Sequence, residues 1–249
     1  MLRVEMKKAA REQIKGNLWV LFAMSMFMLA VFFMASWIGD RVASKIGFAT
    51  AEAENAMSML IYFALILVPG AAMSFSFAKI YLGMVKKVKP KFPDLFAGFK
   101  QVGRVTCMAL LVGIFTFLWS LLFVIPGLIK SLSYSQSFYI LAENPDMKPS
   151  EALKASMKMM NGRKMDLFVL FLSFLGWALL ATLIMIPGPI VAGIGFGLMG
   201  IGMNGLGVMI AGVIVTLAGM FPTWFLLMPY IQATFTNFYL DVKKGVQAD

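Results

Sequence analysis

The sequence predicts an all-α membrane protein. We expect a polytopic bundle of about six transmembrane helices in three hairpins, each preceded by a basic amphipathic helix at the membrane interface. The chain of 249 residues is 60% hydrophobic and 14% charged, whereas soluble domains carry about 25% charged residues. Its apolar runs of about 20 residues alternate with basic segments, a pattern typical of multi-pass membrane proteins. These observations predict a single integral membrane domain over residues 1–249.

Six apolar segments are the expected membrane helices. They cover residues 18–38, 57–81, 106–125, 127–142, 165–186 and 209–235. Taken in pairs, they form hairpins over roughly 18–81, 106–142 and 165–235. The first run follows a basic start and exceeds the roughly 7–15 apolar residues of a signal peptide, so we expect it to be retained as the first helix.

The fourth segment has an ambiguous pattern. In KSLSYSQSFYIL (130–141), every second position is serine: Ser131, Ser133, Ser135 and Ser137. Strict alternation is typical of a strand, but an open strand edge in lipid leaves backbone N–H and C=O groups unpaired. As a helix, the segment carries small polar residues on two faces, which suits close packing between neighbouring helices. We therefore expect a buried helix, entered through a tight turn at Pro126-Gly127.

The distribution of basic residues predicts the topology. Lys and Arg number five in residues 1–17, six in 82–105, five in 143–166 and two after 242, whereas 187–208 carries no charge. Basic residues in short loops stay on the cytoplasmic side. We therefore expect six crossings in a bacterial cytoplasmic membrane, with both termini in the cytoplasm. This rule also accounts for the net charge of +10, so the expected partner is the lipid bilayer and not nucleic acid.

A basic, partly apolar segment precedes each hairpin, which indicates a threefold repeat. The three segments are KKAAREQIKGNLWVLF, DLFAGFKQVGRVTCMALL and EALKASMKMMNGRKMDLFVLF. The first carries a charged stripe from Arg3 to Lys15, and the second carries an apolar stripe from Phe92 to Val102. In the third, Leu153 opposes Lys154. Segments of this kind are expected to be helices lying on the inner leaflet.

A glycine-rich insertion at 188–208 interrupts the third hairpin. The stretch 188–212 contains nine glycines. The alternatives are a re-entrant element, a surface-lying element, or an extension of the two flanking helices. Gly193 and Gly197 form a GxxxG pair, a pattern found at helix–helix contacts in membranes, so self-association through this segment is one expectation.

The candidate site is a polar cleft beside the fourth helix, formed by Lys130, Tyr134, Gln136 and Ser137. A charge at membrane depth marks a candidate functional position. Lys130, however, follows Pro126 closely, near the outer interface, where a lysine side chain extends to water. Extension to water is the favoured interpretation for Lys130, and the cleft is the alternative.

Enzymatic chemistry is not expected. The chain has no histidine and a single cysteine, which removes the usual general base and imidazole ligands for a metal. No Asp or Glu falls in the middle of an expected span. We therefore expect no catalytic residue, no cofactor and no metal site.

Several stretches resemble a known family. They are AREQIKGNLW near the start, residues 134–180 beginning YSQSFYILAENPDMKPSEAL, and MPYIQATFTNFYLDV near the end. In this order they resemble domain of unknown function 975, a family of bacterial multi-pass membrane proteins, with a departure at 188–208. The pattern of IPG, ENP and EAL also resembles the membrane domain attached to some glycerophosphodiester phosphodiesterases. That resemblance implies a shared membrane fold, since nothing here matches their separate catalytic domain.

Two functions remain open from the sequence. The first is a non-enzymatic accessory or scaffold component of a membrane complex related to export or the envelope, with other membrane proteins as partners. The second is a carrier or passage for a lipid or an amphipathic peptide, through a groove beside the Ser-rich fourth helix. The absence of catalytic groups favours the first, and an open polar cleft would favour the second.

Overall fold

The computed structural model describes residues 3–46 and 51–248, and this part of the chain is all-α, as predicted. The helices, in order, are α1 (Arg3–Ile14), α2 (Leu18–Ile46), α3 (Ala51–Val85), η1 (Phe92–Phe96), η2 (Gly98–Gln101), α4 (Val102–Leu122), α5 (Val124–Tyr134), α6 (Ser137–Glu143), α7 (Pro149–Met159), α8 (Lys164–Met185), α9 (Pro187–Gly200), α10 (Leu206–Pro222), η3 (Thr223–Leu227) and α11 (Met228–Ala248). In the described part of the chain, three helical stretches are long and apolar enough to cross a membrane: Leu18–Gly39, Phe63–Val85 and Phe92–Leu122. They indicate a membrane protein.

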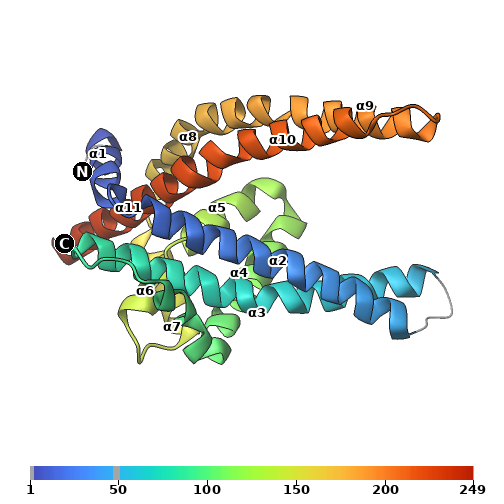
Figure 1. Ribbon diagram of the computed structural model, residues 1–249. Helices are drawn as coiled ribbons and strands as arrows, with labels where there is room; N and C mark the ends of the chain where they lie inside the picture. The colour runs from blue at the N-terminus through green and yellow to red at the C-terminus, as the bar shows by residue number, and fades with distance from the viewer. Residues whose placement is uncertain (1–2, 47–50, 249) are drawn as a thin grey trace.

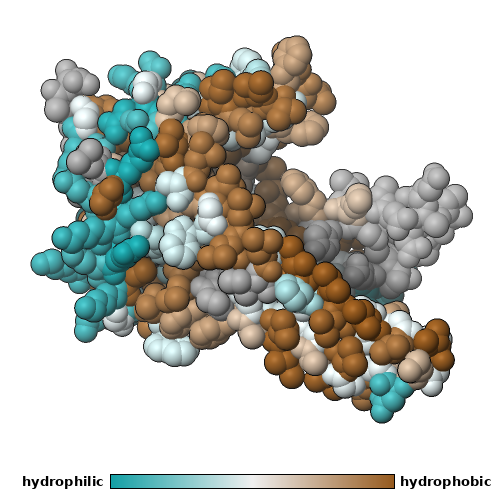
Figure 2. Space-filling model, turned by 90° about the horizontal axis from the view of Figure 1, so that it is seen from above, coloured by the Kyte–Doolittle hydropathy of each residue, from teal (hydrophilic) through white to brown (hydrophobic). Residues whose placement is uncertain are grey.

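Helices that follow one another in the chain pack side by side. The pairs are α2 with α3, α4 with α5, and α9 with α10 (Figure 1). The start of α1 and the end of α11 lie together at one end of the molecule, from which the long pairs extend (Figure 1). Figure 2 shows hydrophilic residues gathered at this end and hydrophobic residues over most of the rest of the visible face. We call it the polar end.

The three basic segments pack against the bundle in different ways. Helix α1 buries Met6, Ala10 and Ile14 and lies mainly on α11, and α7 lies on α6 and α4. The segment before α4 differs from the expected single helix, because it forms two 3₁₀ turns, η1 and η2, against α3. Gly98 explains the close approach: a Cβ at this position would overlap the backbone of Ala72.

The turn between α4 and α5 also differs from the expected one. The turn was expected at Pro126-Gly127, but the residue with extended backbone is Phe123, with φ −160° and ψ 146°. Pro126-Gly127 lies in the first turn of α5. Proline is tolerated there because the first N–H groups of a helix have no intrahelical partner. Gly127 lets the two helices approach closely, since a Cβ would overlap the Ser120 side chain of α4.

The glycine-rich insertion forms helices that extend their neighbours, which is the third of the predicted alternatives. Ile186 keeps α-helical dihedral angles between α8 and α9, and α10 continues through η3 into α11. Helices α9 and α10 touch backbone to backbone, because Gly195 meets Gly205 and Gly212 meets Ala192. The GxxxG pair, Gly193 and Gly197, is exposed and meets no other part of the described chain. Helix packing within the hairpin therefore uses a different set of glycines from the predicted pair.

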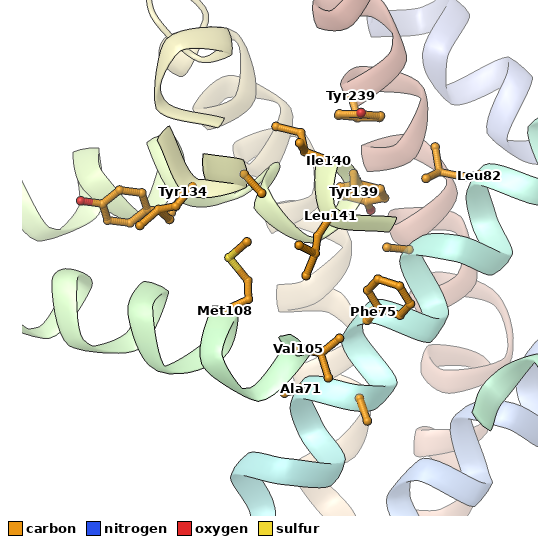
Figure 3. Packing of buried hydrophobic residues seen from close by; sticks show 14 residues of the cluster. Ala71, Phe75, Leu82, Val105, Met108, Tyr134, Tyr139, Ile140, Leu141 and Tyr239 are labelled. Carbon is orange, nitrogen blue, oxygen red and sulfur yellow. The ribbon is translucent and has the colours of Figure 1, made fainter. Parts of the chain in front are cut away.

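The largest cluster of buried hydrophobic residues in the described chain lies where the second half of α3 and the middle of α11 meet α4, α6 and α7. Figure 3 shows this cluster, with Phe75 and Leu82 from α3, Met108 from α4 and Leu141 from α6 pointing toward one another. By contrast, most apolar side chains of α5, α8, α9 and α10 are exposed, as expected for helices that face lipid.

Replacing Gly195 by alanine should destabilise the protein, since the new Cβ would overlap the backbone nitrogen of Met209 on α10. Overpacking of this kind lowers the free energy of unfolding by about 1–3 kcal/mol. Thermal unfolding in detergent would show this loss as a lower midpoint temperature. The matched control is Gly193→Ala, whose Cβ would meet nothing within 4 Å. The control should leave the midpoint unchanged or raise it, because alanine favours helix over glycine. An equal loss in both variants would contradict the packing described for α9 and α10.

Candidate functional site

The Ser-rich fourth segment is broken, not one continuous helix as predicted. It forms α5 and α6, with Ser135 and Gln136 between them. The break changes the hydrogen bonding of the backbone at Ser133 and Gln136. The hydroxyl of Ser156, on α7, donates to the Ser133 carbonyl at 2.7 Å and accepts the Gln136 N–H at 3.2 Å. One side chain from another helix therefore supplies partners at both sides of the break.

The break turns Gln136 toward the centre of the bundle. Its side chain is 2% exposed, and its Nε2 donates to the Ser135 hydroxyl at 2.8 Å. The Oε1 of Gln136 and the hydroxyl of Ser137 are buried without a partner in the described structure. Buried polar atoms are nearly always hydrogen-bonded in proteins, so these two atoms mark a position where a further donor or acceptor is missing.

Gln136 lies on the wall of a central cavity of about 420 Å³ between α2, α3, α6, α8 and α11. None of the described residues that line the cavity is charged. The lining is mainly aromatic and aliphatic, with these polar residues: Ser25, Ser74, Tyr81, Ser135, Gln136, Tyr139 and Gln232. Ser25 and Ser74 each donate to the carbonyl four residues earlier in their own helix. Gln136 Oε1 itself is buried against protein atoms, whereas Gln232 is exposed and offers an amide that a ligand or water in the cavity can reach.

The four residues of the predicted polar cleft fall into two groups. Gln136 lines the central cavity, and Ser137 beside it is fully buried. Tyr134 is buried in the core, with its ring 6.5 Å from that of Phe115 on α4, and its hydroxyl points away from the other labelled residues in Figure 3. Lys130 lies over the ring of Trp119 on α4, 4.6 Å from its centre. The structure therefore places Lys130 and Tyr134 at the packing between α4 and α5, and not among the described residues of the cavity wall.

The cavity also contains residues that were not predicted from the sequence. Tyr81, Tyr139 and Gln232 come from three helices far apart in the chain, and no local pattern connects them. Ser156 had a weak signal, because Ala152 and Ser156 lie four residues apart on one face of an amphipathic helix. Both are buried.

An aromatic and ionic network lies between the cavity and the polar end. Tyr139 stacks on Tyr239, with ring centres 5.2 Å apart. The Tyr239 hydroxyl donates to Glu143 Oε2 at 2.5 Å, and Lys243 Nζ donates to the same oxygen at 2.6 Å. Burial raises the pKa of Glu143, but the hydrogen bonds from Lys243 and Tyr239 outweigh this effect and hold the pKa below its usual range. Glu143 is therefore an ionised anchor at the end of α6, and its Oε2 accepts both hydrogen bonds.

These features define a class of protein: an all-α membrane protein with an uncharged, mainly apolar cavity between its helices that carries a few polar groups. Among the described residues, no three His, Cys, Asp or Glu side chains group as metal ligands. The chain belongs to the family described as "Protein of unknown function (DUF975)", whose model matches residues 121–245. The match spans half of the chain and includes the broken fourth segment and α7.

No curated protein and no solved structure matches the chain. The family match does not extend to the membrane domain of glycerophosphodiester phosphodiesterases, so that resemblance stays a prediction.

Replacing Ser156 by alanine should destabilise the break in the fourth segment, since the Ser133 carbonyl and the Gln136 N–H would both lose a partner. A buried polar group left unpaired costs about 1–3 kcal/mol, which thermal unfolding in detergent would detect. The control is Ser150→Ala in the same helix, because Ser150 is exposed. Indistinguishable midpoints for the two variants would show that the Ser156 hydroxyl does not support the break.

Proposed function

We propose that the chain crosses a bacterial cytoplasmic membrane six times, as three hairpins with both termini in the cytoplasm. The crossings are α2, α3, α4, the fourth segment through α5 and α6, α8 with α9, and α10 continuing toward α11. The pairwise packing of successive helices supports this topology, as does the gathering of hydrophilic residues at one end (Figure 2). With the basic segments on the cytoplasmic side, the polar end faces the cytoplasm.

The proposed function is that of a carrier or passage for an amphipathic molecule, a lipid or a peptide, which enters the central cavity beside the Ser-rich segment. The single observation that carries this proposal is the cavity of about 420 Å³. The cavity is partly open to the surface, since Ser74 and Gln232 of its lining are exposed. Its volume falls within the range of about 300–1,000 Å³ that small-molecule sites have. A closed, fully packed bundle would have favoured the scaffold function instead.

The lining of the cavity limits the chemistry of the occupant. A charged group would enter an environment without a counter-charge, at a large cost in solvation. An uncharged hydroxyl or amide N–H would meet polar lining side chains such as the exposed amide of Gln232. Aromatic side chains such as Phe77 and Phe171 line the rest of the space and suit an apolar body. The cavity therefore fits a neutral polar head on an apolar chain.

This function requires no bond to be made or broken, so the proposal is non-enzymatic. A role as an accessory or scaffold component of an export or envelope complex is the other function predicted from the sequence. No described feature of the structure argues for it directly. It becomes the better proposal if the cavity binds nothing.

Cysteine labelling tests the topology. In a Cys107→Ser background, a Lys154→Cys variant in α7 should react with a membrane-impermeant reagent only after the cells are opened. An Asn204→Cys variant, between α9 and α10, should react in intact cells, because the proposed topology puts this turn outside. Labelling of Lys154→Cys in intact cells would overturn the six-crossing topology.

Photo-crosslinking tests the cavity. The full-length protein in lipid nanodiscs that contain a photoactivatable diacylglycerol should crosslink at α3 and α6. A Ser74→Phe variant, whose new ring takes up part of the cavity, should reduce crosslinking about tenfold, the effect of losing about 1.4 kcal/mol of binding.

The matched control is Ala178→Phe, which adds the same ring to an exposed position on α8 and should leave crosslinking at α3 and α6 unchanged. Equal crosslinking in the wild type and both variants would mean that the lipid does not occupy the cavity. An absence of crosslinks in the wild type would count against a neutral lipid, and the same experiment with an amphipathic peptide would then separate the carrier function from the accessory one.

A further inference from the structure

A second cavity opens at the polar end and has the opposite electrostatic character. Its volume is about 430 Å³, and it lies between the end of α3, the loop that follows α3, the end of α6, and α11. Four lysines line it: Lys79, Lys86, Lys89 and Lys243. We call it the lysine pocket. It shares no lining residue with the central cavity.

The lysine pocket has a surplus of positive charge, because four lysines and only two carboxylates line it. Glu143 accepts hydrogen bonds from Lys243 and from Tyr239. Asp94 accepts the backbone N–H of Lys91 at 2.9 Å and caps η1. Lys79, Lys86 and Lys89 form no ion pair within 4 Å in the described structure, although the charge of Lys86 acts on Glu143 from a greater distance. Three ammonium groups around one cavity repel one another unless an anion joins them.

The walls of the lysine pocket are held by backbone hydrogen bonds. At the end of α3, the Val88 N–H donates to the Gly83 carbonyl at 3.0 Å and the Lys87 N–H donates to Met84 at 2.9 Å. Lys87 has φ of 60°, so this is a helix-terminating turn of the Schellman type. The wall formed by Asp94 and Ala97 is fixed to α3, because the Gly98 N–H donates to the hydroxyl of Ser76 at 2.8 Å. The positions of the lysine backbones are therefore set before any ligand arrives.

We propose that the lysine pocket binds a phosphate-bearing anionic group, supplied by the headgroup of an anionic phospholipid or by a soluble phosphate ester. Ammonium groups are strong donors to phosphate oxygens. Leu82, Val88 and Pro90 give the pocket an apolar part beside the lysines, which suits the glycerol carbons next to a phosphate. Lys79 lies near the end of the apolar stretch Phe63–Val85, and Lys86 and Lys89 follow this stretch directly, as expected for residues at the level of lipid headgroups.

Lysines near a cytoplasmic surface also have a general role, since any basic residue there is attracted to anionic lipid. Binding in the lysine pocket differs from this general attraction because several lysines line one cavity. A diffuse attraction depends on the number of charges at the polar end, whereas a pocket depends on which lysines are removed. The chain offers a matched set for this comparison: Lys148, Lys154 and Lys158 are exposed lysines at the start of and within α7, outside the pocket.

Native mass spectrometry of the full-length protein in an uncharged detergent tests the proposal. The probes are phosphatidylglycerol, phosphatidylcholine and inorganic phosphate. Wild type should bind phosphatidylglycerol at least about tenfold more tightly than phosphatidylcholine, and the triple variant Lys79→Gln/Lys86→Gln/Lys89→Gln should lose most of this preference. The control variant Lys148→Gln/Lys154→Gln/Lys158→Gln, with the same loss of charge, should change the affinity less than about twofold.

Equal losses in the two triple variants would overturn the lysine pocket and leave only diffuse attraction. Equal affinity of wild type for the two lipids would overturn it as well. Displacement of phosphatidylglycerol by millimolar inorganic phosphate would assign the site to a soluble phosphate, and resistance to displacement would assign it to the lipid headgroup. If the triple variant does not fold, the single variants Lys86→Gln and Lys89→Gln carry the same test, each with an expected loss of about threefold.

Discussion

The hydroxyl of Ser156 is the contact on which the centre of this bundle depends. A helix that breaks inside a membrane leaves backbone groups without partners, and lipid cannot supply any. Ser156 donates to one side of the break and accepts from the other. Through this contact, α7 becomes part of the bundle and is not just a helix on its surface. The break in turn directs Gln136 into the central cavity and sets α6 at the angle that brings Tyr139 against Tyr239.

The two cavities differ in the charge of their linings. The central cavity has a lining without charge among the described residues, whereas the lysine pocket lies at the polar end. This difference follows the cost of ionised groups, which is high in the hydrocarbon region and low at the headgroup level. The stacked pair Tyr139 and Tyr239 connects the two regions, because Tyr139 lines the first cavity and Tyr239 bonds to Glu143 in the second. The proposed occupants, a neutral molecule in the first and an anionic headgroup in the second, therefore have separate but adjoining sites.

Much of the fold was predictable because lipid imposes strong local rules. Each predicted apolar segment lies largely within helices, and α1 and α7 coincide with two of the three predicted amphipathic segments. The prediction of a single helix before α4 was wrong. Pro93 and Gly98 favour short turns, and Gly98 packs directly on α3. The glycine-rich stretch left three alternatives open. The stretch forms two touching helices because the backbones of Gly195 and Gly205 are in contact. A local sequence pattern does not show which glycines will meet in this way.

The candidate site was predictable in part. Gln136 and Ser137 were chosen for their polarity in an apolar context, and they lie at or beside the central cavity. Lys130 and Tyr134 were grouped with them by helical spacing, which assumed a continuous fourth helix. The sequence by itself determined the helical class, the apolar segments and the concentration of basic charge near their ends, because these follow from composition and periodicity. Only the tertiary structure decided where the fourth helix breaks, which polar atoms stay unpaired, and which lysines share a pocket. These features depend on contacts such as that of Ser156, which join residues distant in the chain.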